Sequence, residues 1–207
     1  MLQLKVCGIN DYNTLIQLNA LEPNYLGFIF YEPSPRCLTL DKTVLRNVNP
    51  SILKIGVFVN EDYLKVVEKC KLFNLQGVQL HGEESIEYLI LLKSLLPDLI
   101  ISKAFLIDYT FDFNQLLPYS DLVDYFLFDS KSDLYGGSGK KFNWQKLEEY
   151  NLNKPFFLSG GIEVNDLNKI KEINHPQFIG VDINSKFEIA PGIKNIELIK
   201  KFKEQLI

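Results

Sequence analysis

The chain has 207 residues, of which 46% are hydrophobic and 23% charged, and it carries 22 Lys and Arg against 26 Asp and Glu, a net charge of −4. This composition excludes disordered, collagen-like and disulfide-scaffold proteins, and the length predicts one domain over residues 1–207. There is no basic stripe of the kind that binds nucleic acid. The longest apolar stretch, 88–101, is broken by Lys93 and Asp98. It falls short of the roughly 20 apolar residues of a membrane helix, so we expect neither a nucleic-acid nor a membrane partner.

The first ten residues, MLQLKVCGIN, lack the basic start and the apolar run of about 7 to 15 residues that mark a signal peptide. The three cysteines, Cys7, Cys37 and Cys70, are odd in number and irregularly spaced, which does not predict a disulfide framework. We therefore expect a reducing, cytoplasmic location.

Short apolar runs rich in Val, Ile and Phe alternate along the chain with segments of helical periodicity. The expected strands are 2–8, 25–30, 53–59, 77–80, 99–105, 125–129, 155–159 and 178–183. The expected helices are 12–21, 40–48, 63–73, 84–96, 111–117, 144–150, 164–172 and 193–206. This alternation predicts an α/β protein with a parallel sheet covered by helices.

Eight strand–helix units favour a closed (β/α)8 barrel. An open doubly wound sheet is the alternative, but its GxGxxG turn is missing after the first strand, where Cys7-Gly8-Ile9-Asn10 stands. In a (β/α)8 barrel the chemistry lies at the C-terminal ends of the strands. The residues at those ends are therefore the candidates for a site.

Cys7 ends the first strand, with Lys5 two residues earlier on the same face, and it is either a reactive thiol or a small buried hydrophobe. Arg36 follows the second strand in a loop stiffened by two prolines. Its planar guanidinium group is suited to a carboxylate, although a surface arginine is the alternative.

His81 ends the fourth strand and is either functional or structural. Asp129 follows four apolar or aromatic residues, and desolvation there would raise its pKa and suit it to proton donation; otherwise it is a turn or capping residue.

Small residues follow the last three strands. The loop after the sixth strand contains Gly136, Gly137, Ser138 and Gly139, which predicts either a glycine-hinged segment over the site or a plain connection. Gly160 and Gly161 end the seventh strand, and Asn184 and Ser185 follow the eighth. Backbone amides there can approach a ligand, and both positions are recurrent phosphate sites in this fold.

A metal site is not predicted, because His81 and His175 belong to different units and no cysteine pair has zinc-ligand spacing. There is also no Walker loop and no serine nucleophile elbow. We expect no cofactor, so the chemistry falls to the side chains named above.

Seven sequence blocks, in order along nearly the whole chain, resemble the phosphoribosylanthranilate isomerase family, whose members are (β/α)8 enzymes of tryptophan biosynthesis. The blocks are KVCGI at 5–9, GFIF and SPR within 27–36, IGVFVN at 55–60, GVQLHG at 77–82, FD, GGSGK and FNW within 128–144, SGGI at 159–162, and VDINS and PGIK within 181–194.

The resemblance implies an Amadori rearrangement of N-(5-phosphoribosyl)anthranilate to 1-(2-carboxyphenylamino)-1-deoxyribulose 5-phosphate, the third step from chorismate towards tryptophan, without redox change or cofactor. It implies that Cys7 and Asp129 are the acid and base pair. From the needs of the reaction we assign Asp129 as the general acid that opens the ribose ring to a Schiff base, and Cys7 as the base that removes the C2 proton. These roles require a Cys7 pKa below about 8.5 and an Asp129 pKa above about 3.9.

The same resemblance implies that Arg36 holds the anthranilate carboxylate and that Asp182 orients the amino end or the ribose. It places the phosphate at the amides around Gly160, Gly161, Asn184 and Ser185, and it puts His81 near the site without assigning it chemistry. The expected partner is this small-molecule substrate, and the chain is expected to be a monomer or a homodimer.

The chain departs from the family after the eighth strand, where Asn184-Ser185-Lys186 replaces the usual Ser-Ser-Gly. If the family glycine has φ > 0, Lys186 is strained there or the loop is rebuilt; alternatively Lys186 contacts the phosphate. Cys37, Asn143 and Asn195 are further departures, and none involves the proposed proton-transfer pair.

Two other interpretations remain open. One is a different sugar-phosphate barrel of the histidine or tryptophan pathways. The histidine-pathway aminoaldose isomerase has an aspartate on strand one and repeated halves, whereas Cys7 stands here and no repeat is found. Indole-glycerol-phosphate synthase usually carries an extension before its first strand, which here is expected to begin at Leu2. The other interpretation is a barrel that binds a sugar phosphate without catalysis, in which Cys7 is structural.

Overall fold

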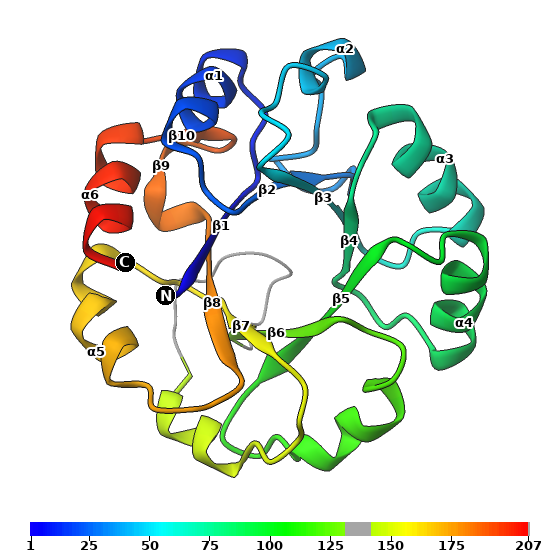
Figure 1. Cartoon of the computed structure of the whole chain (residues 1–207), viewed down its shortest axis with the longest axis vertical. Helices are drawn as coiled ribbons and strands as arrows, with labels where there is room; N and C mark the ends of the chain where they lie inside the picture. The colour runs from blue at the N-terminus through cyan, green and yellow to red at the C-terminus, as the bar shows by residue number, and fades with distance from the viewer. Residues whose placement is uncertain (131–141, 207) are drawn as a thin grey trace.

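The computed structural model describes residues 1–130 and 142–206. Within them, eight parallel strands close into a barrel with helices on the outside (Figure 1). The strands are β1 (Gln3–Cys7), β2 (Tyr25–Ile29), β3 (Leu53–Phe58), β4 (Gly77–Leu80), β5 (Ile100–Ile107), β6 (Tyr125–Ser130), β7 (Phe156–Leu158) and β8 (Phe178–Ile183). Because β1 pairs with β8 as well as with β2, the sheet has no edge. The predicted (β/α)8 barrel is confirmed, and the open doubly wound alternative is wrong.

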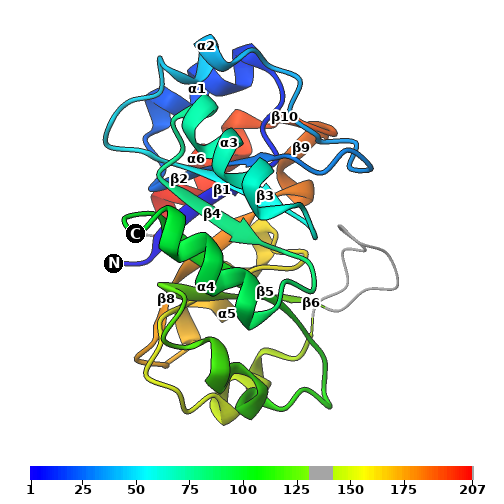
Figure 2. The same ribbon diagram turned by 90° about the vertical axis from the view of Figure 1, so that its right-hand side faces the viewer.

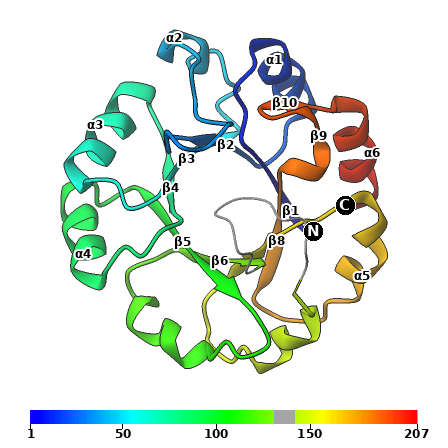
Figure 3. The ribbon, with the colours of Figure 1, turned by 180° about the vertical axis from the view of Figure 1, so that it is seen from behind.

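The outer layer contains α-helices and short 3₁₀ segments, and it surrounds the barrel in the opposite view as well (Figure 3). The α-helices are α1 (Tyr12–Leu21), α2 (Lys42–Leu45), α3 (Tyr63–Phe73), α4 (Ile86–Leu95), α5 (Leu167–Glu172) and α6 (Ile196–Leu206). The 3₁₀ segments are η1 (Phe113–Tyr119), η2 (Trp144–Glu149), η3 (Val164–Asp166) and η4 (Ser185–Phe187). A two-stranded hairpin, β9 (Glu188–Ala190) and β10 (Ile193–Lys194), lies between β8 and α6.

Polar side chains fix where the longer helices begin. Asp11, Asp62 and Ser85 precede α1, α3 and α4, and each accepts a hydrogen bond from an amide of the first turn that has no partner within the helix. α1 and α3 end at Glu22 and Asn74, which adopt the left-handed conformation with φ of 49° and 50°. α1 and α3 accordingly have the predicted bounds.

Several predicted helices are shorter or of a different type. The segment expected at 111–117 is the 3₁₀ helix η1, which contains Pro118, a residue without an amide donor. The segment at 144–150 is also 3₁₀, and the one at 40–48 is the single turn α2. The last helix begins at Ile196 rather than Ile193, because Ile193 and Lys194 pair with β9 and Asn195 caps the helix through the Leu198 amide.

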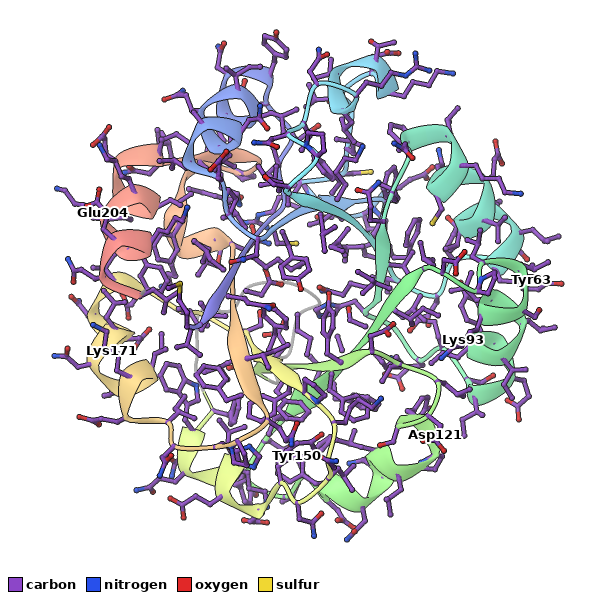
Figure 4. All side chains as sticks on the ribbon, in the orientation of Figure 1. Tyr63, Lys93, Asp121, Tyr150, Lys171 and Glu204 are labelled. Atoms are coloured by element: carbon purple, nitrogen blue, oxygen red, sulfur yellow. The ribbon has the colours of Figure 1, made fainter. Side chains whose placement is uncertain are left out.

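Two apolar layers form the core. Alternate strand residues point outward and pack beneath the helices, while the lower barrel interior is filled by Tyr25, Ile55, Ala104, Tyr125, Leu127 and Phe157. The rings of Tyr25 and Phe157 meet edge to face at 5.5 Å. Charged side chains such as Lys171 and Glu204 project from the outer helices (Figure 4). Since this aromatic layer fills the barrel, a ligand can reach the interior polar groups only from the C-terminal ends of the strands.

We expect Gly180→Ala to destabilise the fold. Gly180 lies on β8 beside β1, and a Cβ there would lie 2.8 Å from the Phe157 ring and closer still to the carbonyl oxygen of Gln3. The free energy of unfolding in urea should fall by roughly 1–3 kcal/mol, as in other overpacked cores. Asn168→Ala, at an exposed position of α5, is the control and should change it by less than about 0.5 kcal/mol. Equal stability of the two variants would contradict the tight β1–β8 contact.

Candidate active site

Cys7 lies at the C-terminal end of β1 on the inner face of the barrel. Its side chain packs with Ile29 and Val57, and the residue is 4% exposed. Gly27 stands opposite on β2, where a Cβ would lie only 2.7 Å from the Cys7 Sγ. Gly27 therefore makes the space that the thiol occupies. We did not single out Gly27 from the sequence, although it begins the GFIF block.

An ion pair lies directly below the thiol. Lys5 on β1 and Asp182 on β8 are register partners, and the Lys5 Nζ lies 2.7 Å from the Asp182 Oδ2 with both side chains buried. Burial alone would lower the pKa of Lys5, but Asp182 and Cys7 together raise it above its ordinary value, so Lys5 is an ammonium. Among the described residues the buried Asp182 Oδ1 has no hydrogen-bond partner, which leaves this oxygen for a ligand.

The protonation state of Cys7 differs from the prediction. Burial raises the pKa of the Cys7 thiol above its ordinary value, against the opposing effect of Lys5 and Lys194. The expectation of a lowered pKa, which the resemblance required, is therefore wrong for the unliganded protein. A cationic neighbour is visible in the sequence, whereas the full desolvation of the sulfur is decided by the residues packed around it.

Asp129 lies at the end of β6, and it is less enclosed than its apolar neighbours indicate. Phe126 and Phe128 point outward beneath the helices, Tyr125 and Leu127 lie on the inner face, and the Asp129 side chain remains 23% exposed. Its Oδ1 accepts a hydrogen bond of 2.7 Å from the Ser130 amide. Half of the preceding apolar run therefore faces away from Asp129, because alternate strand residues face opposite sides.

His81 follows β4 and faces Asp129, with 3.3 Å between its Nε2 and the Asp129 Oδ2. Its Nδ1 lies 2.8 Å from the Gln79 Nε2, an amide nitrogen that can only donate. With the Gln79 amide in this orientation Nδ1 accepts, and Nε2 is the ring nitrogen that faces the Asp129 carboxylate. The structure therefore brings together His81 and Asp129, and it gives His81 a geometric role that the sequence left open.

Arg36 is largely enclosed rather than solvated. The Glu188 carboxylate accepts hydrogen bonds from the Arg36 Nε at 2.9 and 3.0 Å and from the Arg36 Nη2 at 2.7 Å. A Cβ built on Gly8 would lie 2.9 Å from the Arg36 Cδ and 2.7 Å from the Asn184 Oδ1. Gly8, with φ of 74°, thus allows both side chains to approach the end of β1.

Two charged residues of the site were missed as functional candidates, Glu188 on β9 and Lys194 on β10. The Lys194 side chain is fully buried, and its Nζ lies 2.7 Å from both the Glu188 Oε1 and the Asn184 Oδ1. Lys194 is in the PGIK block, which signalled the family but gave no role to the lysine. Glu188 had no sequence signal beyond its place after the eighth strand.

The glycine pair after β7 has the backbone freedom that close ligand approach needs. Gly160 and Gly161 have φ of 87° and 64°, and a Cβ on Gly160 would lie 2.7 Å from the Asp129 Oδ1 and closer to the Ser130 Oγ. Within the part of the chain that the structure describes, the amides of Gly160 and Gly161 donate to no backbone or side-chain acceptor. These amides therefore lie beside the Asp129 carboxylate and are open to a ligand.

Across the barrel seam, Ser185 and Lys186 begin the 3₁₀ turn η4 after Asn184. Lys186 is exposed, and it is not among the described non-glycine residues with positive φ. Of the alternatives left open for this position, backbone strain at Lys186 is not found, and the residue lies in the 3₁₀ turn η4. The expected hinge at Gly136, Gly137, Ser138 and Gly139 lies outside the described residues.

Over residues 1–130 and 142–206, no three His, Cys, Asp or Glu side chains are grouped as a metal site. Over the same ranges, no helix combines the length and the apolar character that a membrane span needs.

Comparison with known proteins gives one consistent family. Residues 4–205 match the sequence profile described as N-(5'-phosphoribosyl)anthranilate (PRA) isomerase. A Parabacteroides distasonis protein named N-(5'-phosphoribosyl)anthranilate isomerase is 41% identical over 207 residues, covering 99% of this chain and 93% of the relative. The crystal structure of phosphoribosyl anthranilate isomerase from Thermotoga maritima has a TM-score of 0.83 and 28% identity, covering 100% and 98% of the two chains. Another structure of such an isomerase, with a TM-score of 0.81, 25% identity and coverage of 100% and 98%, contains reduced 1-(o-carboxyphenylamino)-1-deoxyribulose 5-phosphate.

We expect the Cys7 thiol to titrate above about 8.5, the usual value for a free thiol. Because burial raises its folded-state pKa, the thiolate should form only as the pH rises well past neutrality. The measurement is the ultraviolet thiolate absorbance of the wild type minus that of Cys7→Ser, which cancels the contributions of Cys37 and Cys70. A difference signal already complete below neutral pH would show that the lysines outweigh burial.

Proposed function

The chain belongs to the N-(5'-phosphoribosyl)anthranilate isomerase family, and we propose that it catalyses the Amadori rearrangement of N-(5-phosphoribosyl)anthranilate to 1-(2-carboxyphenylamino)-1-deoxyribulose 5-phosphate in tryptophan biosynthesis. The observation that carries this assignment is the convergence of four strand ends. Cys7, His81, Asp129 and Asp182 all face inward at the C-terminal mouth of one barrel. Such a mouth supplies proton-transfer groups and a carboxylate binder without a redox group.

The two proton transfers are assigned to Asp129 and Cys7. Asp129 donates a proton to the ribose ring oxygen as the C1–O bond breaks, and the substrate nitrogen forms a protonated Schiff base. Cys7, as thiolate, then removes the proton from C2, which gives an enolamine. Tautomerisation of the enolamine yields the ketone, so that no atom is gained or lost. His81, whose Nε2 lies 3.3 Å from the Asp129 Oδ2, is assigned the role of holding the carboxyl group in place.

The base of this mechanism is the Cys7 thiolate, and two effects on the pKa of Cys7 oppose each other. Burial raises the pKa of the thiol, which disfavours the thiolate, whereas the ammonium groups of Lys5 and Lys194 favour it. Burial is the larger effect, so the fraction of thiolate increases as the pH rises above neutrality.

The remaining contacts of the substrate are assigned to polar groups around the barrel mouth. Arg36, whose Nε and Nη2 already donate to Glu188, receives the anthranilate carboxylate. The Asp182 Oδ1, which has no hydrogen-bond partner among the described residues, receives the amino end or the ribose. The phosphate is held by amides at Gly160, Gly161, Asn184 and Ser185. All lie around the same barrel mouth, since Gly160 adjoins Asp129 and Asn184 adjoins Gly8.

A single domain over residues 1–207, a cytoplasmic location and a monomer or homodimer complete the proposal. The described residues form one barrel, and Cys7, Cys37 and Cys70 are all unpaired, which suits a reducing compartment.

Cys7→Ser and Asp129→Asn should each lower kcat by at least about 10², the range for loss of one general acid or base. Turnover is followed by the change in anthranilate fluorescence on mixing with N-(5-phosphoribosyl)anthranilate. Asp121→Asn, the same substitution at an exposed position, should leave kcat unchanged. A wild-type protein that binds the substrate without converting it would favour the non-catalytic barrel and overturn the enzymatic assignment.

The kcat/KM should rise with pH across the neutral range and level off only above the pKa of Cys7. The sign follows from the raised pKa: burial favours the protonated thiol at neutral pH, and only the thiolate can accept the C2 proton. Initial rates at low substrate concentration across the neutral and alkaline range provide the test. A kcat/KM that is already level at neutral pH would show that the thiolate is formed there, against the effect of burial.

A further inference from the structure

Glu188 occupies one particular edge of the Arg36 guanidinium. The group is planar and has five N–H donors, and it can be bound side-on, through Nε and Nη2, or end-on, through Nη1 and Nη2. Glu188 takes the side-on edge, with distances of 2.9 and 3.0 Å to Nε and 2.7 Å to Nη2. The end-on edge, formed by Nη1 and Nη2, therefore remains for a second carboxylate. The Glu188 carboxylate sets the direction in which this edge points.

Glu188 belongs to a hairpin that is not part of the eight-stranded barrel. β9 and β10 form a short hairpin between β8 and α6, and Figure 2 shows it away from the barrel end at which β1 starts. Gly192, with φ of 85°, forms its turn and donates its amide to the Glu188 Oε1 at 3.1 Å. The Gly192 carbonyl accepts from the Asn10 amide at 3.1 Å, which ties the hairpin to the loop after β1. The Glu188 carboxylate is thus fixed before any ligand arrives.

Lys194 sets the charge of this cluster. Its fully buried Nζ lies 2.7 Å from the Glu188 Oε1 and 2.7 Å from the Asn184 Oδ1. Burial would raise the pKa of Glu188, but Arg36 and Lys194 lower it below its ordinary value, so Glu188 is an anion. Burial lowers the pKa of Lys194, against the opposing effect of Glu188. With Lys194 as the ammonium that its 2.7 Å ion pair with Glu188 favours, two cations and one anion leave one net positive charge. An Arg36–Glu188 pair without the lysine would be neutral and would attract a carboxylate less strongly.

We propose that Glu188 is a positioning residue that orients Arg36 for two-point recognition of the substrate's aromatic carboxylate, with Lys194 keeping the cluster positive. This inference rests on the proposed function, and specifically on Arg36 as the carboxylate binder. It makes the β9–β10 hairpin a determinant of specificity. A loose arginine loses side-chain entropy on binding, whereas a guanidinium already held on one edge loses little.

The expected signature is a change in substrate binding rather than in chemistry. In Glu188→Gln, the amide cannot accept charge-assisted hydrogen bonds from both the Arg36 Nε and the Arg36 Nη2. The end-on edge of Arg36 is then no longer held in the direction of the substrate carboxylate. We expect KM to rise about tenfold and kcat to change by less than about threefold, as for loss of one aligned charge-assisted contact. Glu197→Gln, the same substitution on the exposed side of α6, is the matched control and should leave both constants unchanged.

A double-mutant cycle separates positioning from general support of the fold. If Glu188 acts through Arg36, the variant Arg36→Ala/Glu188→Gln should have the KM of Arg36→Ala alone. If the two effects on KM multiply instead, Glu188 is merely structural and the proposal is overturned. A Glu188→Gln variant with wild-type KM overturns it as well.

Binding measured without turnover keeps this inference distinct from the enzymatic assignment. Calorimetry with reduced 1-(o-carboxyphenylamino)-1-deoxyribulose 5-phosphate and with its analogue lacking the carboxylate gives the carboxylate preference of each variant. The wild type should prefer the carboxylate, and Glu188→Gln should lose about tenfold of that preference. An unchanged preference in Glu188→Gln refutes the positioning role, even if the wild type proves to lack turnover. If Glu188→Gln does not fold, Glu188→Asp replaces it, because its shorter carboxylate cannot reach both Nε and Nη2.

Discussion

The ion pair between Lys5 and Asp182 is the constraint around which the barrel mouth is arranged. It joins the first strand to the last, because the two residues are register partners across the β1–β8 seam. Neither charge can be buried alone, since an unpaired ion in this interior would cost several kcal/mol. The pair therefore requires the barrel to close in one register. That register places Asp182 beside Lys5, and the two-residue period of β1 places Lys5 on the same face as Cys7.

Burial and charge oppose each other throughout this site. The thiol of Cys7 has two ammonium groups in its surroundings, yet enclosure by Ile29, Val57 and the barrel wall outweighs them and keeps it protonated. Asp129 is less enclosed, with 23% of its side chain exposed and its Oδ1 accepting from the Ser130 amide. The two groups thus differ in environment, as acid–base partners do.

The β9–β10 hairpin, outside the barrel strands, also fixes a side chain of the site. The β9–β10 hairpin contributes no strand to the barrel, but Glu188 and Lys194 meet Arg36, which comes from the opposite end of the chain. Arg36 is thereby turned from a flexible loop side chain into a fixed one. Gly8, Gly27 and Gly192 serve the same purpose by leaving room for neighbouring side chains or by forming a turn.

The sequence by itself determined the barrel and the identity of most groups at its mouth. Period-two and helical apolar patterns depend on local geometry, so all eight strands could be found. Strand ends identified Cys7, His81 and Asp129, because the C-terminal ends of parallel strands meet at one side. Only the tertiary structure decided how those groups behave. Packing between residues far apart in the chain decides three properties of the site. They are the raised pKa of Cys7, the partial exposure of Asp129 and the hydrogen bonds between Arg36 and Glu188. Desolvation and ion pairing are set by three-dimensional neighbours, which a local pattern does not contain.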